Sequence, residues 1–390
     1  MKGKPYMYEN EVQHRLIEIL YAAVNELEST ESIKQKITPD IFPAVYRLAK
    51  KHDLAHIVSN FVYRNKIEID SVLQGRLQQE EIMSVYRHEQ MKYAFEEICG
   101  VFDEVGVKYI PLKGSVLRSY YPYESMRTSC DIDILIHEED LDTAINGLKN
   151  KGYRYGERNY HDVSLYAPNK IHLELHFNIQ ENIKKLDAVL KDAWKYAVLT
   201  NGSQYAFKKE FFAFHIFAHM AYHFLSGGCG IRPLLDIWVM EHKMGINYEC
   251  ARELLEKAGI YNFAAEISRV SEICFSGNPK DEFSDTILFY IFSGGVYGTS
   301  NNKIAVKKSK SRSTLLYALK RLFPTYNSMK VLYPILKKTP YLLPFCWIAR
   351  WITALFGGKS KRVFSEMKRA QNMSDEKIKE VTEICSRLGL

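Results

Sequence analysis

The segment 111–136 constrains this chain most, because it places a glycine–serine turn shortly before a strand of alternating acidic and apolar residues. We expect Lys113, Gly114 and Ser115 to open a short helix over 116–120. A glycine at such a junction allows a ligand to approach the backbone closely, and the N–H groups of a helix start favour an anion. Ser115 adds a hydroxyl donor. The turn is therefore predicted to bind phosphate.

Two aspartates follow this turn on one face of a predicted strand. Residues two apart on a strand share a face, so Asp131 and Asp133 project together, away from the isoleucines that alternate with them. Adjacent like charges are costly unless a cation lies between them, and Asp oxygens suit Mg²⁺ or Mn²⁺. A third carboxylate should lie on a neighbouring strand, and Glu174 in the alternating segment 171–177 supplies it. These three acids are the candidate catalytic and metal-binding residues.

This arrangement resembles the DNA polymerase beta-type nucleotidyltransferase superfamily, which carries a G-S turn, an acidic pair on a strand and a third acid on a later strand. The motifs L-K-G-S, Y-Y-P, D-I-D-I-L-I and L-E-L-H are similar to the bacterial branch called the uncharacterised nucleotidyltransferase family. The resemblance is sharp over 105–180 and looser through His219, Arg232, Asp236 and the region 323–334. It implies metal-assisted transfer of a nucleotidyl group from an NTP. It implies no particular acceptor, because acceptors in that superfamily range from nucleic acids to antibiotics to proteins.

Basic side chains near these acids have more than one reading. Lys113 is either a solvated lysine or a phosphate contact, and Arg127 either pairs with Asp131 or binds a triphosphate. Arg232 and Asp236 lie four residues apart at the start of a predicted helix. They form an intrahelical ion pair or they line the cleft, where Arg232 would meet phosphate. Lys113, Arg127 and Arg232 join Gly114 and Ser115 as candidate nucleotide-binding residues.

The histidines of interest fall in two groups. One predicted strand carries His172 and His176, and one predicted helix carries His215, His219 and His223. His172 and His176 share a face with Glu174, which leaves a metal site open as an alternative, but His176 is better read as a residue that orients the site or meets substrate. The four-residue spacing on the helix also permits a metal site, although it lacks the glutamate of the H-E-x-x-H pattern. The resemblance implies that His219 or His223 lines the cleft, and His219 and His176 are candidate nucleotide-binding residues.

The predicted fold is α+β and mostly helical, with a small mixed sheet as its core. We expect a helical region over 1–104, a nucleotidyltransferase core over 105–200, a helical region over 201–300 that lines the cleft, and a helical region over 301–390. Within the core we expect strands over 107–110, 132–136 and 153–156, and a hairpin formed by 163–167 and 171–178. The first 100 residues show helical periodicity and no chemistry, so they are predicted to cap the sheet.

The region 301–370 is strongly basic. It holds sixteen Lys and Arg against one acid, so the rest of the chain carries eight net negative charges within an overall charge of +7. Such a division usually marks a surface for an anionic partner. Interleaved aromatic residues suit single-stranded nucleic acid or a membrane surface, and a helical domain with solvated lysines is the plain alternative.

Composition favours a soluble globular protein of the cytoplasm. Hydrophobic and charged contents of 46% and 25% are ordinary for a globular protein, and the seven cysteines contain no C-x-x-C, which favours a reducing cytoplasm. We expect no signal peptide, because Met1 is followed by polar and charged residues. The sequence predicts transfer of NMP from an NTP to an unknown hydroxyl-bearing acceptor (RNA, protein, sugar or small molecule). Alternatives are an inactive nucleotide-binding scaffold acting through its basic region, and a histidine metalloprotein.

Overall fold

The computed structural model describes most of the chain and divides it into two compact units. The described residues are 4–27, 31–276, 281–296, 298–309, 322–356, 369 and 373–390. The first unit comprises the described parts of Met1–Tyr222 and Gly230–Val296 with Gly389, and the second those of His223–Cys229 and Tyr297–Leu388 with Leu390. The predicted α+β, mostly helical fold with a mixed sheet is confirmed.

A seven-stranded mixed sheet forms the core of the first unit, in the order β3-β4-β5-β2-β1-β7-β6. Its strands are β1 (Tyr109–Pro111), β2 (Asp131–Ile136), β3 (Arg154–Arg158), β4 (Asp162–Tyr166), β5 (His172–His176), β6 (Ala197–Asn201) and β7 (Gln204–Phe207). Two pairs, β2 with β5 and β1 with β7, are parallel, and the remaining pairs are antiparallel. The predicted hairpin of β4 and β5 is therefore confirmed, and it brings β5 beside β2.

The hairpin of β6 and β7 was not expected, because no strand was predicted beyond residue 178 and the region 201–300 was predicted to be helical. The dipeptide Asn201-Gly202 is a strong hairpin signal, since glycine readily takes the positive φ that a tight turn requires. Gly202 has φ +53°, and Asp103 accepts a hydrogen bond of 2.7 Å from the next amide, that of Ser203. The hairpin extends the sheet beyond β1.

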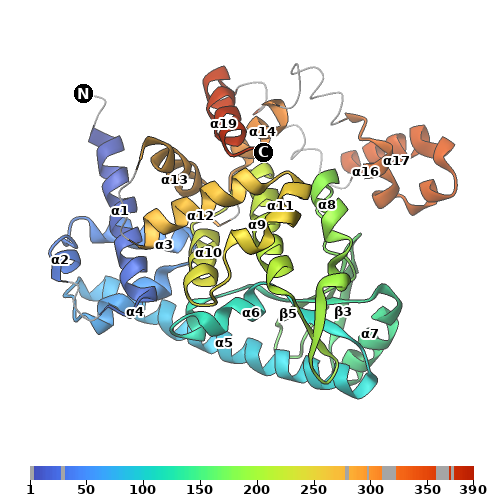
Figure 1. The fold of residues 1–390 in the computed structure, drawn as a ribbon, viewed down its shortest axis with the longest axis horizontal. Coiled ribbons are helices and arrows are strands. Elements are labelled where there is room, and N and C mark those ends of the chain that lie inside the picture. Colours follow the sequence, from blue (N-terminus) through green and yellow to red (C-terminus); the bar gives the residue numbers. More distant parts are fainter. Residues whose placement is uncertain are drawn as a thin grey trace. The chain divides into compact units, whose positions relative to one another are not determined.

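Helix α5 (Ser71–Val105) covers the face of the sheet opposite the acidic side chains. Its N-cap, Asp70, accepts hydrogen bonds from two amides of the first turn, and Gly106 ends it in the left-handed conformation. With α7 (Leu141–Asn150) it buries one continuous apolar core against β2 and β5. In Figure 1 this long helix runs beneath α6 and the strands. Because Ile132 and Ile134 of β2 are buried in this core, the polar side chains that alternate with them point to the other face of the sheet.

The first unit contains further helices before, between and after the sheet strands. They include α1 (Lys4–Val24), α3 (Phe42–Lys51), α4 (Ala55–Arg64), α6 (Gly114–Leu117), α8 (Lys184–Leu190), α9 (Lys209–Leu225, whose last turn belongs to the second unit), α10 (Arg232–His242), α11 (Arg252–Ala258), α12 (Tyr261–Phe275) and α13 (Glu282–Gly294). Helix α9 supplies the buried phenylalanines of its segment to the core and carries the three spaced histidines.

The second unit is helical in its described residues. It contains α14 (Ser300–Ser309), α16 (Tyr326–Leu332), α17 (Leu343–Phe356) and α19 (Asp375–Arg387). Of the basic region 301–370, residues 310–321, 357–368 and 370 lie outside the described residues. Within the described chain, no helix is both long enough and apolar enough to cross a bilayer.

Candidate functional site

The three predicted acids lie side by side on two parallel strands. In the register of β2 and β5, Asp133 lies opposite Glu174 and Asp131 lies opposite His172. The alternation is as predicted: Ile132 and Ile134 are buried in the core, whereas the three carboxylates are half-buried on the other face. The sheet thus gathers acids that are some forty residues apart in the chain.

Two overlapping groups of side chains could hold a metal ion in the described part of the chain. One comprises Asp131, His172 and Glu174, and the other Asp133, Glu174 and His176, with the ligand atoms of each group within 4.8 Å of one another. Both contain Glu174, which lies opposite Asp133 in the sheet. The helical histidines predicted as an alternative metal site form no such group among the described residues.

Asp133 is held as an anion by two cations. The Nε2 atom of His176 donates to its Oδ1 at 3.0 Å, and the Lys113 ammonium lies 3.7 Å from its Oδ2. Burial raises the pKa of Asp133, but Lys113 and His176 outweigh burial and hold it well below its usual range. Burial lowers the pKa of His176, yet its bonds to Asp133 and to Glu174 (3.4 Å) raise it to about 9. His176 is therefore a protonated residue that orients the acids.

Asp131 has the opposite electrostatic character. Burial, followed by the neighbouring charges of Asp133 and Glu174, raises the pKa of Asp131 to about 6. The cluster therefore holds more negative charge than its own lysine and histidines neutralise. A divalent cation is the usual remedy for such an excess.

The glycine–serine turn begins with a strained residue, Lys113. As N-cap of α6 it has φ +35° and ψ −100°, which side chains rarely adopt, and strain of this kind gathers at functional sites. Its ammonium lies between Asp133 and His219, whose Nε2 is 3.5 Å away. The Nδ1 atom of His219 faces Glu181 at 3.2 Å, a contact that sequence reasoning missed. Burial, then Lys113, holds the pKa of His219 well below its usual value, so the imidazole is neutral.

The turn offers an anion less backbone than the sequence suggested. Helix α6 has four residues and begins at Gly114, and the N–H of Ser115 already donates to the Leu112 carbonyl at 3.0 Å. A helix this short has little macrodipole. The nearby basic side chains are therefore the stronger attraction for phosphate, because Ser115 lines a pocket with Met91 and Phe95 of α5 and with Ile132.

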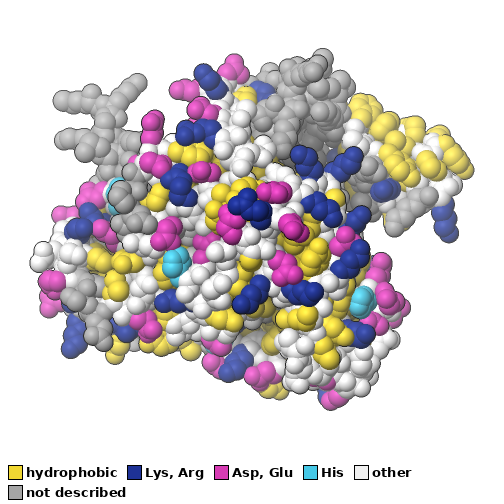
Figure 2. Space-filling model, viewed as in Figure 1, with side chains coloured by type: hydrophobic (Ala, Val, Ile, Leu, Met, Phe, Trp, Pro, Cys, Tyr) yellow, Lys and Arg dark blue, Asp and Glu magenta, His cyan; other side chains and the backbone are white. Residues whose placement is uncertain are grey.

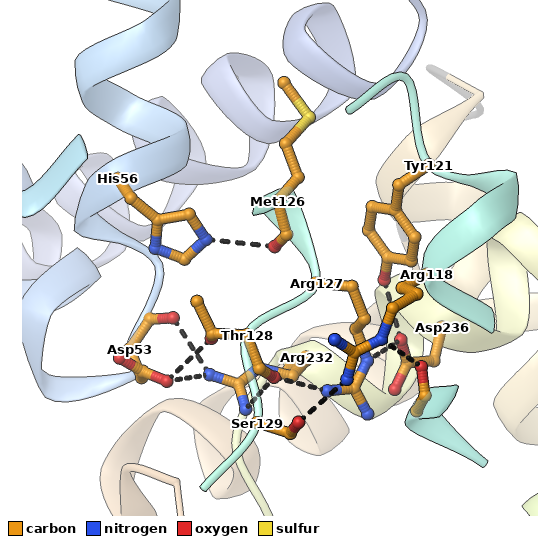
Figure 3. Close-up of polar contacts among 11 residues, drawn as sticks. Asp53, His56, Arg118, Tyr121, Met126, Arg127, Thr128, Ser129, Arg232 and Asp236 are labelled. Carbon is orange, nitrogen blue, oxygen red and sulfur yellow. Dashed lines mark hydrogen bonds and ion pairs between the residues drawn. The ribbon is translucent and has the colours of Figure 1, made fainter. Parts of the chain in front are cut away.

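Arg127 is fixed against this turn by an acid distant in sequence. Its Nε donates to Asp236 Oδ1 at 2.7 Å, and the hydroxyl of Tyr121 donates to the same oxygen at 2.7 Å (Figure 3). A Cβ on Gly114 would lie 3.6 Å from the Arg127 guanidinium, so the arginine packs on the glycine. Burial lowers the pKa of Arg127, but Asp236 raises it above its usual value. Arg127 thus pairs with Asp236, whereas the sequence offered Asp131.

Arg232 points to the N-terminal helices. It donates to the Asp53 carbonyl at 2.9 Å, forms an ion pair with the Asp53 carboxylate, and donates to the Thr128 carbonyl at 3.3 Å (Figure 3). The intrahelical pair with Asp236 was therefore wrong, because both residues have partners elsewhere. Asp53, just after α3, was not foreseen, since the first 100 residues were predicted to carry no chemistry.

This network joins three parts of the first unit. His56 on α4 bonds the Met126 carbonyl at 2.9 Å, and Arg118 donates to the Gly114 carbonyl and to Ser129 Oγ, each at 3.0 Å (Figure 3). The chain between the turn and β2 is thereby held on both sides. This segment leads directly into β2, so its contacts fix the position at which β2 begins with Asp131.

Three acids on adjacent strands, beside a glycine–serine turn with a lysine and an arginine, are typical of enzymes that move nucleotidyl groups with metal help. Sequence comparison reaches the same class: the model of the family described as "Uncharacterised nucleotidyltransferase" matches residues 38–276. This is more than half of the chain, which therefore belongs to that nucleotidyltransferase family. No curated protein and no solved structure matches the chain.

Proposed function

We propose that the protein transfers NMP from an NTP to a hydroxyl-bearing acceptor with release of pyrophosphate, using Mg²⁺ or Mn²⁺. The observation that carries the proposal is the group of three carboxylates on β2 and β5, with Asp133 opposite Glu174. Asp131, Asp133 and Glu174 offer the oxygen ligands that these ions prefer. The raised pKa of Asp131 is compatible with this fit, because its causes are burial and then the charges of Asp133 and Glu174.

The bound metal would polarise the α-phosphate and lower the pKa of the acceptor hydroxyl. The chain's own residues bind and orient the substrates. Lys113 turns its ammonium from Asp133 to the triphosphate, beside the turn formed by Gly114 and Ser115. Arg127 adds positive charge beside the turn, where Asp236 holds it.

The two histidines have separate roles in this proposal. His176 keeps Asp133 ionised and oriented through its 3.0 Å bond. His219 accepts from the Lys113 ammonium through Nε2 at 3.5 Å and so helps to position the lysine. Arg232, predicted as a phosphate contact, acts instead as a positioning residue through Asp53 and the Thr128 carbonyl.

An assay that follows the nucleotide tests the proposal and names the acceptor. Purified protein, Mg²⁺ and each α-³²P-labelled NTP are mixed with a cell extract separated into RNA, protein and small-molecule fractions. We expect label in one fraction, and its loss with Asp133→Ala or with a chelator. Label in no fraction, with NTP binding still measurable, would reject transfer in favour of a binding protein.

A further inference from the structure

A small helical module forms part of the described second unit. It comprises residues 322–356, with α16 and α17 packed around its own core of Met329, Leu336 and Cys346. Tyr326 donates to the Leu336 carbonyl at 2.8 Å, which ties the two ends of the core together. The module therefore has a hydrophobic core of its own among the described residues.

One face of this module exposes a stripe of large apolar side chains. Tyr341, Phe345, Ile348 and Ile352 are exposed by 74, 67, 49 and 50%. Their spacing of four, three and four residues places them on one side of α17 and the turn before it. Figure 2 shows hydrophobic side chains gathered over this module. Patches of contiguous apolar surface on a folded protein usually mark an interaction site.

The charge of the module has a single sign. Residues 322–356 contain Lys330, Lys337, Lys338 and Arg350 and no Asp or Glu. Protein partners generally offer both signs of charge, whereas a bilayer rich in acidic lipids offers a uniform negative surface above an apolar interior. The combination of an apolar stripe with only basic charge matches the second kind of partner.

We infer that this module docks on an anionic lipid bilayer, with α17 lying in the plane of the interface. Helix α17 has 14 residues, about 21 Å, which is short of the roughly 30 Å of a hydrocarbon core. Phe345, Ile348 and Ile352 enter the boundary between headgroups and acyl chains, and the exposed Lys338 meets lipid phosphate. The inference rests on residues outside the carboxylate site, so it stands apart from the proposed function.

The aromatic rings of the module fit a membrane better than single-stranded nucleic acid. Trp347 and Trp351 donate their indole N–H groups to the carbonyls of Pro324 and Leu322, at 3.0 and 2.9 Å. Phe323 packs edge-on against both indoles, with ring centroids 5.2 and 5.0 Å apart. These three rings therefore pack within the module. Two members of the exposed stripe are isoleucines, which offer no aromatic face on which a base could stack.

Vesicle flotation of the full chain tests the inference. We expect the protein to float with vesicles of phosphatidylcholine mixed with phosphatidylglycerol, and to float less with phosphatidylcholine alone or at high salt. Ile348→Asn with Ile352→Asn should weaken vesicle binding about tenfold or more, because each change removes an apolar side chain from the boundary. Ile82→Asn on α5, where the isoleucine is 59% exposed, is the matched control and should bind as the native chain does.

Each other outcome overturns the inference. Absence of flotation with the acidic vesicles at low salt would do so, as would equal binding by the native chain and the double variant. Binding of a labelled single-stranded oligonucleotide that the same double variant abolishes, without vesicle binding, would assign the module to nucleic acid. Melting curves of both variants show whether the fold is kept, which the exposure of all three isoleucines leads us to expect.

Discussion

Lys113 carries both backbone strain and positive charge at the candidate site. Its φ of +35° costs on the order of 1 kcal/mol or more, and the surrounding contacts hold it there. The benefit is the direction of the ammonium, between Asp133 and His219. A strained residue whose side chain is directed at the acids indicates a functional role. Mutation can measure the two effects separately: the backbone strain through stability, and the positive charge through the rate of transfer.

Lys113→Gly should affect stability and transfer in opposite directions. Glycine relieves the positive φ, so the unfolding free energy should rise by about 1 kcal/mol or stay level. Loss of the ammonium should lower kcat/KM by roughly a hundredfold. Lys170→Gly is the matched control, because Lys170 has φ +70° in the turn between β4 and β5. It should gain similar stability in urea unfolding and keep full transfer; a Lys113→Gly enzyme as active as the native one would refute the role.

At the scale of elements, the strands were easier to predict than the ion pairs that join segments distant in the sequence. The alternation of polar and apolar residues predicted β2 and β5, and the turn between 167 and 171 predicted the hairpin of β4 and β5. The three acids could therefore be named from local patterns. The pairs Arg127–Asp236 and Arg232–Asp53 join residues 109 and 179 positions apart, which no local period reveals. The hairpin of β6 and β7 was missed although Asn201-Gly202 signalled it.

The contact of α10 with the turn should be costly to break. Asp236→Ala leaves Arg127 buried without its acid, so we expect a loss of about 3 kcal/mol in unfolding free energy. Asp53→Ala should cost at most about 1 kcal/mol, since the Asp53 side chain is 53% exposed whereas that of Asp236 is 9% exposed. Urea unfolding of both variants measures the difference. Equal losses would show that Asp236 does not balance a buried charge.

His52 joins three helices and should make stability depend on pH. It follows α3, accepts from the Ile231 amide at the start of α10 and contacts the Phe292 carbonyl of α13, so it is neutral. Burial, then Lys51, lowers its pKa to about 4 from an ordinary 6.5. The unfolded chain therefore takes up a proton first, and stability falls as pH drops from 6.5 towards 4, by about 3 kcal/mol. His52→Gln should flatten this slope in urea unfolding at pH 7 and 5; an unchanged slope would contradict it.

For the whole molecule, the two proposed tasks, nucleotidyl transfer and membrane docking, fall on different residues, and the family match covers only those proposed for transfer. Residues 38–276 include every candidate site residue, whereas the module 322–356 lies beyond the match. Nucleotidyl transfer should therefore proceed in solution without the apolar stripe of α17. We expect the Ile348→Asn and Ile352→Asn double variant to keep the native kcat with a dissolved acceptor. A large loss of kcat in a well-folded variant would mean that the module takes part in catalysis.

The most direct test of the central claim follows two labels at once. Native protein and Asp131→Ala are each given Mg²⁺, the accepting fraction, and the preferred NTP labelled either at the α- or at the γ-phosphate. We predict that the native protein moves only the α-label to the acceptor, that the γ-label leaves in pyrophosphate, and that Asp131→Ala does neither while melting as a folded protein. Transfer of the γ-label to the acceptor, or undiminished α-transfer by Asp131→Ala, would contradict nucleotidyl transfer by these carboxylates.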